Sequence, residues 1–281
     1  MNFFDKLVEQ ALQNNMQLSV LRPVVEKEIL HHDILREMSA AGFLKELTFI
    51  GGTCLRNCYG SHRLSEDLDF SGGFAFDRKN LKDMGRLLKD RIYQKYGFYV
   101  EVSEPVKDQS NTDTWKLKII VRPERADLTA QRINIDICRL ESYDRQPVIM
   151  RNHYGIDMGT SGLILYAESM EEILADKIVA LALRLNRFKY RDIWDIVWLH
   201  SQNITINKEF IRQKLNDRNV KYEIFSDNMQ NRYELLKESH DDFLFEMKRF
   251  LPVRDFEDTL NKKDFWVYVL SLINNFQKNI L

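Results

Sequence analysis

The sequence predicts an α+β protein in which a mixed β-sheet lies between amino-terminal helices and a carboxy-terminal helical region. Three observations lead to this prediction. Apolar residues recur at helical spacing at both ends of the chain, runs between about 45 and 165 alternate apolar and polar residues, and turn-prone stretches separate these runs. We therefore expect amino-terminal helices and an α/β core over 1–165, and a helical domain over 166–281 packed against them.

Glycine and proline set most of the expected boundaries in the first part of the chain. Pro23 opens the second amino-terminal helix and Gly42 ends it, because proline suits the first helical turn and glycine the position after the last. Gly97 ends an amphipathic helix in the same way. The elements expected here are helices over 2–42, 53–60 and 78–97, and strands over 47–50 and from 67 onward.

Alternation of side chains marks the rest of the core. The runs FYVEVSEPV, WKLKIIVRP and RINIDICRL, which begin at Phe98, Trp115 and Arg132, each alternate as a half-buried strand does. Ser169 and Glu172 form a capping box that starts a helix in ESMEEILADKIVALALRL. From there to the carboxy terminus the helical spacing dominates.

Length and composition bound the classes of protein to which the chain can belong. With 281 residues, 44% of them apolar, it can bury a sizeable core. The net charge of −1 provides no global positive field, so binding to nucleic acid needs a local basic patch. Three cysteines without zinc-like or paired spacing suit a reducing cytoplasm. We expect neither a signal peptide nor a membrane span, because acids interrupt the first segment and every apolar run is short.

Two aspartates in SEDLDF carry the first chemical signal. Asp67 and Asp69 are two residues apart, so a strand presents both carboxylates on one face. Such neighbours repel each other unless a cation lies between them, and Mg²⁺ takes oxygen ligands of this kind together with substrate phosphates. In RINIDICRL, Asp136 lies opposite the isoleucines and is a candidate third ligand. Three acids on neighbouring strands can hold two metal ions about 4 Å apart, which activate a hydroxyl and stabilise a departing pyrophosphate.

The preceding sequence FIGGT predicts a phosphate site. A strand that runs through two glycines into a helix leaves backbone N–H groups available to an anion at the first helical turn. Gly51 and Gly52 let a phosphate approach the backbone without a Cβ in the way, and Thr53 adds a hydroxyl donor. The segment that follows returns the chain so that Asp67 and Asp69 face the same phosphates.

Each of these signals has a plainer explanation on its own. An Asp-x-Asp pair is most often a solvated strand end, and two glycines before a helix most often form a tight turn. The order strand, Gly-Gly-Thr, helix, Asp-x-Asp, strand and later aspartate, all in one short span, is much harder to attribute to chance. We therefore favour a catalytic site.

These residues resemble a known superfamily. The strand with GGT, the following RLSEDLDF and an acid on a later strand resemble the nucleotidyltransferase signature, which belongs to the fold of DNA polymerase beta. More narrowly, FIGGTCLRNCYGSHRLSEDLDF and ESMEEILADKIVALALRLNRFKYRDIWDIVWL resemble the AbiEii/AbiGii toxin family, over roughly residues 22–200. The resemblance implies a nucleotidyltransferase-like toxin of a type IV toxin–antitoxin or phage-defence system, related to the MenT toxins.

The second block adds candidate residues from the helical region. Its Arg-Asp-x-x-Asp pattern is met by Arg191, Asp192 and Asp195, and Lys177 matches a lysine on the preceding helix. Lys177 suits a triphosphate ligand because it is a mobile point charge. Arg184 lies seven residues on, on the same helical face, where it can make a second phosphate contact. Asp195 can accept the acceptor hydroxyl's proton or orient Lys177 or a nucleotide group, while the plain alternative is a surface ion pair with Arg191.

The resemblance also implies a functional role for Ser65, beside those of Asp67, Lys177 and Asp195. One position departs from the family pattern, since members often carry a lysine directly before the two glycines where this chain has Ile50. That change removes one phosphate contact and leaves the acids untouched. His62 and Arg63 precede the aspartate pair, and contact with nucleotide or RNA is the less favoured reading of them.

A basic cluster in RLNRFKYR is a candidate RNA contact. Arg187, Lys189 and Arg191 alternate with Phe188 and Tyr190, and basic residues interleaved with stacking rings suit a single-stranded RNA end. A solvated helix turn explains the cluster nearly as well.

We expect a metal-dependent nucleotidyltransferase that moves a nucleoside monophosphate from a nucleoside triphosphate such as ATP or GTP to an acceptor. Asp67, Asp69 and Asp136 would hold Mg²⁺ or Mn²⁺, with Asp136 also a candidate base, and Gly52, Thr53, Ser65 and Lys177 would bind the triphosphate. The resemblance implies an RNA acceptor, with the tRNA 3′ end as the first choice, and an antitoxin protein as partner.

Two alternatives remain open at this point. The same fold can modify a protein side chain or a small molecule such as an aminoglycoside, and the near-neutral charge favours this mildly. The other alternative is a nucleotide-binding module without turnover. The presence of all three candidate metal-binding acids argues against it.

Overall fold

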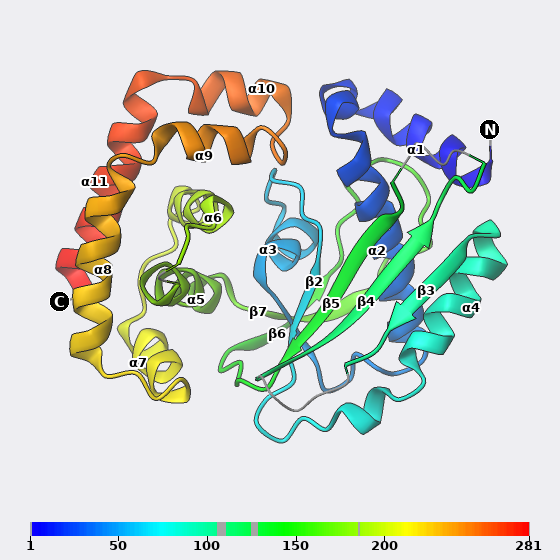
Figure 1. The fold of residues 1–281 in the computed structure, drawn as a ribbon, viewed down its shortest axis with the longest axis horizontal. Coiled ribbons are helices and arrows are strands. Elements are labelled where there is room, and N and C mark those ends of the chain that lie inside the picture. Colours follow the sequence, from blue (N-terminus) through cyan, green and yellow to red (C-terminus); the bar gives the residue numbers. More distant parts are fainter. Residues whose placement is uncertain (1, 106–110, 125–128, 185, 281) are drawn as a thin grey trace. The chain divides into compact units, whose positions relative to one another are not determined.

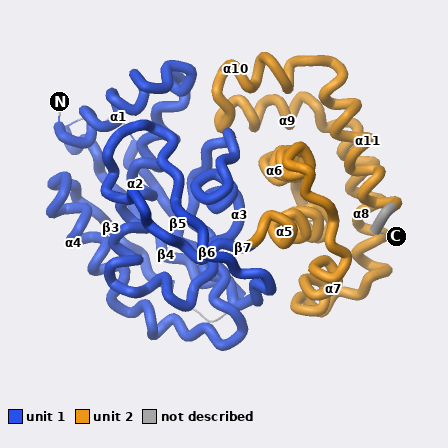
Figure 2. Tube along the Cα trace, turned by 180° about the vertical axis from the view of Figure 1, so that it is seen from behind, with its two compact units in different colours: residues 1–168 blue, residues 169–281 orange. Residues whose placement is uncertain are grey.

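The computed structural model describes residues 2–105, 111–124, 129–184 and 186–280. The chain divides into two compact units, unit 1 over residues 1–168 and unit 2 over 169–281 (Figures 1 and 2). Unit 1 contains a β-sheet with helices, and unit 2 is helical. Residue 106 of the strand expected from Phe98 and residue 185 of the helix expected from Ser169 lie outside the described residues.

Unit 1 is built on a seven-stranded sheet. Two strand pairs, β1 with β7 and β2 with β5, are parallel and the others are antiparallel, so the sheet is mixed as predicted. In spatial order the strands are β3 (Tyr99–Ser103), β4 (Thr112–Ile120), β5 (Gln131–Cys138), β2 (Leu68–Ser71), β1 (Thr48–Ile50), β7 (Ile164–Glu168) and β6 (Arg145–Ile149).

The helices of unit 1 pack against this sheet and against each other (Figure 1). Helix α2 packs on β5, α4 packs on β3, and the two helices contact one another. Gly97 ends α4 in the left-handed conformation (φ +72°), which confirms the predicted stop. The helices described in unit 1 are α1 (Phe3–Asn14), the 3₁₀ helix η1 (Met16–Leu21), α2 (Arg22–Ala40), α3 (Gly51–Cys54), the π-helix η2 (Leu55–Tyr59), the 3₁₀ helix η3 (Arg78–Leu81) and α4 (Met84–Tyr96).

Strand alternation separates an apolar from a polar side of the central strands. Leu68 and Phe70 of β2 pair in register with Ile135 and Ile137 of β5, and all four are buried. The Phe70 ring also packs on Phe49 of β1, with 5.1 Å between centroids. The intervening positions of β2 and β5 are acids, which burial of the apolar side holds in register.

Strand β6 was not expected from the sequence. Its run RQPVI is largely exposed, lies at the edge of the sheet and contains Pro147. Proline cannot donate to a ladder and is therefore confined mainly to edge strands. The alternation that reveals a half-buried strand is weak where one neighbour is solvent.

Unit 2 consists of helices around α5. Ser169 caps α5 by accepting the Glu172 N–H at 3.3 Å, which confirms the Ser169 half of the predicted capping box. Helix α5 packs against α6, α7 and α8. The bounds are α5 (Met170–Leu183), α6 (Tyr190–Ser201), α7 (Lys208–Asp217), α8 (Tyr222–Leu236), α9 (His240–Met247), α10 (Val253–Asp255), the π-helix η4 (Phe256–Leu260) and α11 (Lys263–Ile280). Within the described ranges, each helix is too short or too polar to cross a membrane.

Candidate active site

The strand register of unit 1 brings two predicted acids side by side. Asp69 of β2 is the register partner of Asp136 on β5, and on its other side Asp69 pairs with Ile50 of β1. Register partners on neighbouring strands lie about 4.8 Å apart and point to the same face. Asp69 and Asp136 therefore share one face of the sheet, at the end of β1 from which the Gly51–Gly52 turn leaves.

Asp67 is anchored just before β2. Its Oδ1 accepts a hydrogen bond from the Asn134 N–H at 3.2 Å, so the side chain joins β2 to β5 where the ladder of main-chain bonds begins. The Thr53 hydroxyl contacts the Asp67 carbonyl oxygen and lies 2.7 Å from the Ser65 Oγ. Thr53 and Ser65 are both buried. The predicted triphosphate ligands Thr53 and Ser65 thus lie in direct contact with the segment that carries Asp67.

The two glycines make room for different groups. Gly51 has a φ of +75°, and a Cβ on it would lie 3.0 Å from Oδ2 of Asp69. A Cβ on Gly52 would lie only 2.1 Å from Nη2 of Arg63 and 3.4 Å from the Ser65 Oγ. The space over Gly52 is therefore taken by the Arg63 guanidinium, where the sequence had suggested an approach for phosphate.

Arg63 is not among the site residues predicted from sequence. It is buried, and its Nη1 donates to the Leu64 carbonyl oxygen at 2.9 Å. Its position two residues before Ser65 was the available signal, but only the fold reveals that the guanidinium reaches the Gly-Gly turn. Arg63 therefore places a permanent positive charge against the Gly-Gly turn.

The acids offer the right ligand chemistry for a divalent cation. Carboxylate oxygens are the protein ligands that Mg²⁺ and Mn²⁺ prefer. Among the residues that the structure describes, however, no three carboxylate, imidazole or thiolate groups are close enough to hold one ion together. The donor set fits a cation that also takes oxygens from phosphate and water, with Asp69 and Asp136 as neighbouring ligands and Asp67 two positions away.

The predicted residues of unit 2 form a buried ionic cluster. Nζ of Lys177 on α5 lies 2.6 Å from Asp192 Oδ1 and 2.8 Å from Asp195 Oδ2, both on α6. Asp195 is 0% exposed and Lys177 is 8% exposed. The plain alternative of a surface ion pair with Arg191 does not hold for Asp195, because its carboxylate is buried and bound by Lys177. Of the two roles left open for Asp195, this geometry favours orientation of Lys177.

Asp192 is the centre of this cluster. Arg184 at the end of α5 donates from Nη1 to Asp192 Oδ2 at 2.7 Å, while Lys177 binds the other oxygen. Burial opposes ionisation of Asp192, but the charges of Lys177, Lys189 and Arg184 outweigh it and hold its pKa below the ordinary value. Asp192 is thus ionised at neutral pH and joins the two predicted phosphate ligands, Lys177 and Arg184.

The basic cluster predicted to contact RNA is partly engaged in packing. Arg191 forms an ion pair with Glu246 at 3.3 Å, and its guanidinium lies over the Phe250 ring. The Phe188 and Tyr190 rings stack on each other, and the guanidinium of Arg232 covers Phe188 at 3.5 Å. Arg187 is exposed and Lys189 is half-buried. Arg187 is therefore the member of the cluster best placed to meet a partner in solution.

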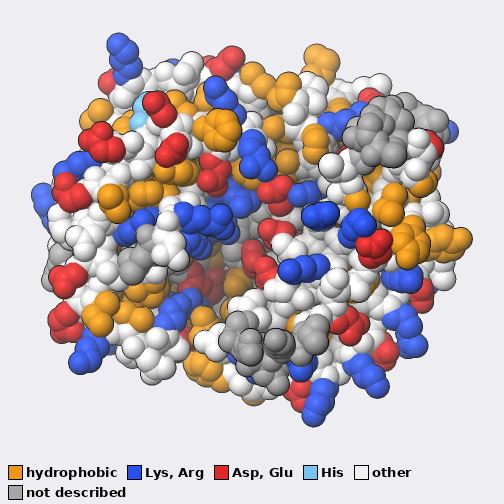
Figure 3. Space-filling view, viewed as in Figure 1, with side chains coloured by type: hydrophobic (Ala, Val, Ile, Leu, Met, Phe, Trp, Pro, Cys, Tyr) orange, Lys and Arg blue, Asp and Glu red, His pale blue; other side chains and the backbone are white. Residues whose placement is uncertain are grey.

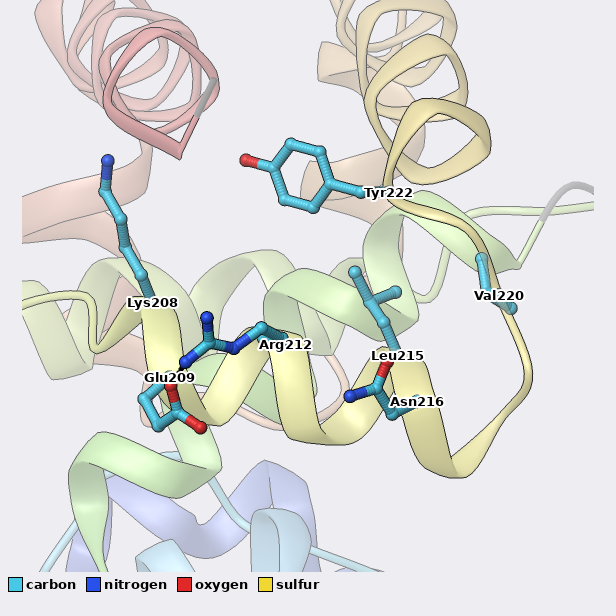
Figure 4. A pocket seen from close by; sticks show the side chains of 7 residues that line it. All are labelled: Lys208, Glu209, Arg212, Leu215, Asn216, Val220 and Tyr222. Atoms are coloured by element: carbon cyan, nitrogen blue, oxygen red, sulfur yellow. Dashed lines mark hydrogen bonds and ion pairs between the residues drawn. The ribbon is translucent and has the colours of Figure 1, made fainter.

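Two cavities, one in each unit, lie away from these residues. In unit 2, seven residues of α7, α8 and the loop between them line a cavity of about 420 Å³ (Figure 4). In unit 1, a cavity of about 410 Å³ is lined by residues between Ala41 and Leu81. Neither lining includes a predicted site residue. On the surface, basic and acidic side chains are interspersed over the face in Figure 3, in line with the net charge of −1.

Solved structures share this fold at low sequence identity. The chain is similar to MenT4, a nucleotidyltransferase toxin from Mycobacterium tuberculosis H37Rv, with a TM-score of 0.55, 13% identity, and coverage of 100% of this chain and 93% of that one. It is also similar to JHP933 from Helicobacter pylori, with a TM-score of 0.50, 14% identity, and coverage of 92% and 93%. These likenesses confirm the predicted α+β nucleotidyltransferase fold. No curated protein matches the chain by sequence.

Family membership follows from the sequence itself. The model of the family described as "Nucleotidyl transferase AbiEii toxin, Type IV TA system" matches residues 33–262, which is most of the 281 residues. The match spans both predicted blocks, from before Gly51 to beyond Asp195. The chain therefore belongs to the AbiEii nucleotidyltransferase toxin family of type IV toxin–antitoxin systems.

Proposed function

We propose that the chain transfers a nucleoside monophosphate from a nucleoside triphosphate to a hydroxyl acceptor, with a divalent cation held by Asp67, Asp69 and Asp136. The observation that carries this proposal is the register of β2 with β5, which sets Asp69 beside Asp136 and next to Gly51. Family membership supports the reaction class. Bound Mg²⁺ or Mn²⁺ would supply positive charge to the triphosphate and the leaving pyrophosphate.

The chain's own groups would bind and orient the reactants. The acceptor oxygen forms a bond to the α-phosphorus, the bond from that phosphorus to the β-bridging oxygen breaks, and pyrophosphate leaves with the electron pair. Asp136 is the candidate to take the acceptor's proton. Thr53 and Ser65, with the N–H groups of Gly51 and Gly52, are the proposed contacts to the phosphates in unit 1, and we add Arg63 to this set because its guanidinium lies against Gly52.

Lys177 and Arg184 are the proposed triphosphate ligands of unit 2. Their shared partner Asp192 holds both cations on one carboxylate, which restricts where their charges can lie. Asp195 is proposed as a positioning residue for Lys177, since a fully buried carboxylate bound to an ammonium is poorly placed to receive a proton from a large acceptor. Preorganised charge of this kind contributes to catalysis because it needs no rearrangement during the reaction.

RNA is the proposed acceptor, with the tRNA 3′ end as the first choice, and the cytoplasm is the proposed compartment. Family membership supports toxin action on an intracellular target, and the three cysteines lack the paired spacing that is typical of proteins from oxidising compartments. The exposed Arg187 and the half-buried Lys189 are the remaining candidates for RNA contact; the engagement of Arg191 with Glu246 makes it a weaker one.

The experiment is transfer of label from each of the four α-labelled nucleoside triphosphates to total RNA in the presence of Mg²⁺. Label on RNA with the wild type, and none with Asp67→Ala, is the expected result. Absence of transfer from every nucleotide to every acceptor would refute the proposal. For the toxin role, expression should arrest growth of a bacterial host, the Asp67→Ala variant should not, and co-expression of the cognate antitoxin should restore growth.

A protein side chain or small molecule is the second candidate acceptor. Two observations favour it: the net charge of −1, and the engagement of the cluster within unit 2, where Arg232 covers Phe188 and Arg191 lies over Phe250. Denaturing gels separate labelled RNA from labelled protein, and thin-layer chromatography reveals a labelled small molecule. Label that resists ribonuclease and migrates with protein would replace RNA as the acceptor while leaving the transfer chemistry intact.

A further inference from the structure

Glu28 of α2 is a buried acid in direct contact with the predicted nucleotide site. It is 1% exposed. Its Oε1 accepts a hydrogen bond from the Ser65 N–H at 2.9 Å, and its Oε2 accepts from Arg56 Nε at 3.2 Å and from the Tyr154 hydroxyl. One carboxylate thus joins α2, the π-helix η2 and the loop after β6 to the main chain of Ser65.

The same face of α2 makes further contacts with this segment. His31, one turn after Lys27, places Nε2 3.0 Å from the Glu66 carbonyl oxygen, and Lys27 binds the Glu66 carboxylate at 2.7 Å. Residues four apart on a helix share a face, and Glu28 adjoins it. Helix α2 therefore holds two consecutive residues, Ser65 and Glu66, immediately before Asp67.

The bonding of Glu28 compensates fully for its burial. Burial alone opposes ionisation, but the Arg56 guanidinium, the Tyr154 hydroxyl and the Ser65 N–H outweigh it, so the pKa of Glu28 lies below its ordinary value. Buried ion pairs are often no more stabilising than apolar side chains of the same volume, so stability is a weak reason to bury this acid. What an apolar residue cannot supply is a hydrogen-bond acceptor that fixes the Ser65 main chain.

We propose that Glu28 is a positioning residue for nucleotidyl transfer, which holds the Ser65 main chain so that the Ser65 hydroxyl and the Asp67 carboxylate face the metal-bound nucleotide. The inference rests on the proposed function, because Ser65 and Asp67 are its site residues. The link is short: Ser65 Oγ contacts Thr53, and the Thr53 hydroxyl contacts the Asp67 carbonyl oxygen. A shift of the Ser65 main chain therefore reaches both groups.

Two substitutions at Glu28 separate the effect of side-chain length from the effect of charge. Glu28→Gln keeps the length of the side chain and an oxygen for the Ser65 N–H but loses the charge. Glu28→Asp keeps the negative charge but withdraws the carboxylate by one methylene from the Ser65 N–H and from Arg56. Tyr154→Phe is the matched control, since it removes a bond to the same carboxylate on the oxygen remote from Ser65. Thermal unfolding of each variant reports whether the fold is kept.

The readouts are the affinity for Mn²⁺ with nucleoside triphosphate, followed by electron paramagnetic resonance, and the rate of label transfer. We expect Glu28→Asp to weaken both by about 10- to 100-fold, as loss of a residue that orients ligands does. Glu28→Gln should retain more of both than Glu28→Asp, and Tyr154→Phe should stay within about threefold of the wild type on the same scale.

Three results would overturn the proposal: Glu28→Asp equal to the wild type, Glu28→Gln weaker than Glu28→Asp, or Tyr154→Phe as weak as Glu28→Asp. Glu28→Asp keeps the buried negative charge, so its comparison with Tyr154→Phe, once thermal unfolding shows both variants to be folded, decides alone if Glu28→Gln does not fold. If the wild type binds Mn²⁺ with nucleotide but transfers no label, the proposed function is refuted. The Mn²⁺ affinities of the variants then still test the role of Glu28. If the wild type binds neither Mn²⁺ nor nucleotide, the proposed function and the proposed role of Glu28 are both refuted.

Discussion

The ammonium of Lys177 lies between two carboxylates, 2.6 Å from Asp192 and 2.8 Å from Asp195, in the interior of unit 2. Helices α5 and α6 are therefore joined by a charge as well as by apolar packing. Lys177 is thus both a proposed triphosphate ligand and a structural residue that joins α5 to α6. Loss of activity on substitution of Lys177 has two sources, which must be measured separately.

Substitution of Lys177 by methionine should destabilise the protein as well as inactivate it. Arg184 still binds Asp192 in this variant, but the ammonium that offsets the buried Asp195 charge is lost. Removal of one member of a buried pair typically costs about 3–5 kcal/mol. Urea unfolding followed by circular dichroism measures the change. The matched control is Lys237→Met, because Lys237 pairs with Glu234 at 2.7 Å on the exposed face of α8 and its loss should leave the midpoint nearly unchanged. Equal midpoints for Lys177→Met and the wild type would show that the pair does not stabilise α5 on α6.

Gly51→Ala should reduce activity beyond its effect on stability. An alanine at a φ of +75° costs about 1–2 kcal/mol, and its Cβ would lie 3.0 Å from Asp69 Oδ2. Gly97→Ala is the matched control, with a φ of +72° and open space around the new Cβ. Both variants should lose similar stability by urea unfolding, while Gly51→Ala alone should lower the transfer rate, by about tenfold for a shift of a few tenths of an ångström. Equal rates in the two variants would place Asp69 outside the reaction.

Much of the fold is predictable because burial imposes a period on the sequence. Ile133, Ile135 and Ile137 alternate with polar residues, and the structure places them on the buried side of β5. The helix stop at Gly97 depends only on backbone geometry. The helix predicted over 78–97 took residues 78–81 as its first turn, but they form a separate 3₁₀ turn, which depends on neighbouring residues and has no period of its own.

The contacts of the site are less predictable than its residue types. Alternation predicts which face Asp136 occupies, but the pairing of Asp69 with Asp136 depends on strand order across the sheet. The burial of Asp195 depends on the packing of α6 on α5. Glu28 had one signal: it lies three residues after Val25 and four before His32, so an acid interrupts the buried stripe of α2. An acid in such a stripe needs a buried partner, which the sequence cannot name.

Asp136→Asn should abolish transfer without unfolding the protein, if Asp136 binds the cation as proposed. Asparagine keeps the shape but weakens an oxygen ligand and removes the candidate base, so the rate should fall by more than about 100-fold. The same assay in EDTA should show no transfer by the wild type, with recovery on addition of Mn²⁺ or Mg²⁺. Glu101→Gln, which changes the net charge equally at an exposed position of β3, should retain full activity. Transfer that persists in EDTA would exclude the metal-dependent mechanism.

Acid should destabilise unit 1 through His153. Burial and then the Arg56 guanidinium lower the pKa of His153 from 6.5 to about 4, while Nε2 contacts the Arg56 carbonyl oxygen at 2.8 Å. Because the folded pKa lies below the unfolded value, the unfolded chain binds more protons between these two pH values. The stability that His153 contributes is therefore complete above pH 6.5 and is lost as the pH falls towards 4.

His153→Gln isolates this contribution, since glutamine can still donate to the Arg56 carbonyl oxygen and does not titrate. The free energy of unfolding, measured in urea from pH 7 to pH 4, should fall less steeply in the variant. Between pH 7 and pH 4, the wild type should lose about 2 kcal/mol more unfolding free energy than the variant. The whole pKa shift of His153 corresponds to about 3 kcal/mol, and the smaller figure is expected because the ring is only partly buried. His32, whose pKa burial and the charges of His31 and His153 lower to about 3, stays neutral in the folded protein down to about pH 4 and so contributes about equally to both pH profiles. Parallel pH profiles would show that the ring takes up its proton without opposing the fold.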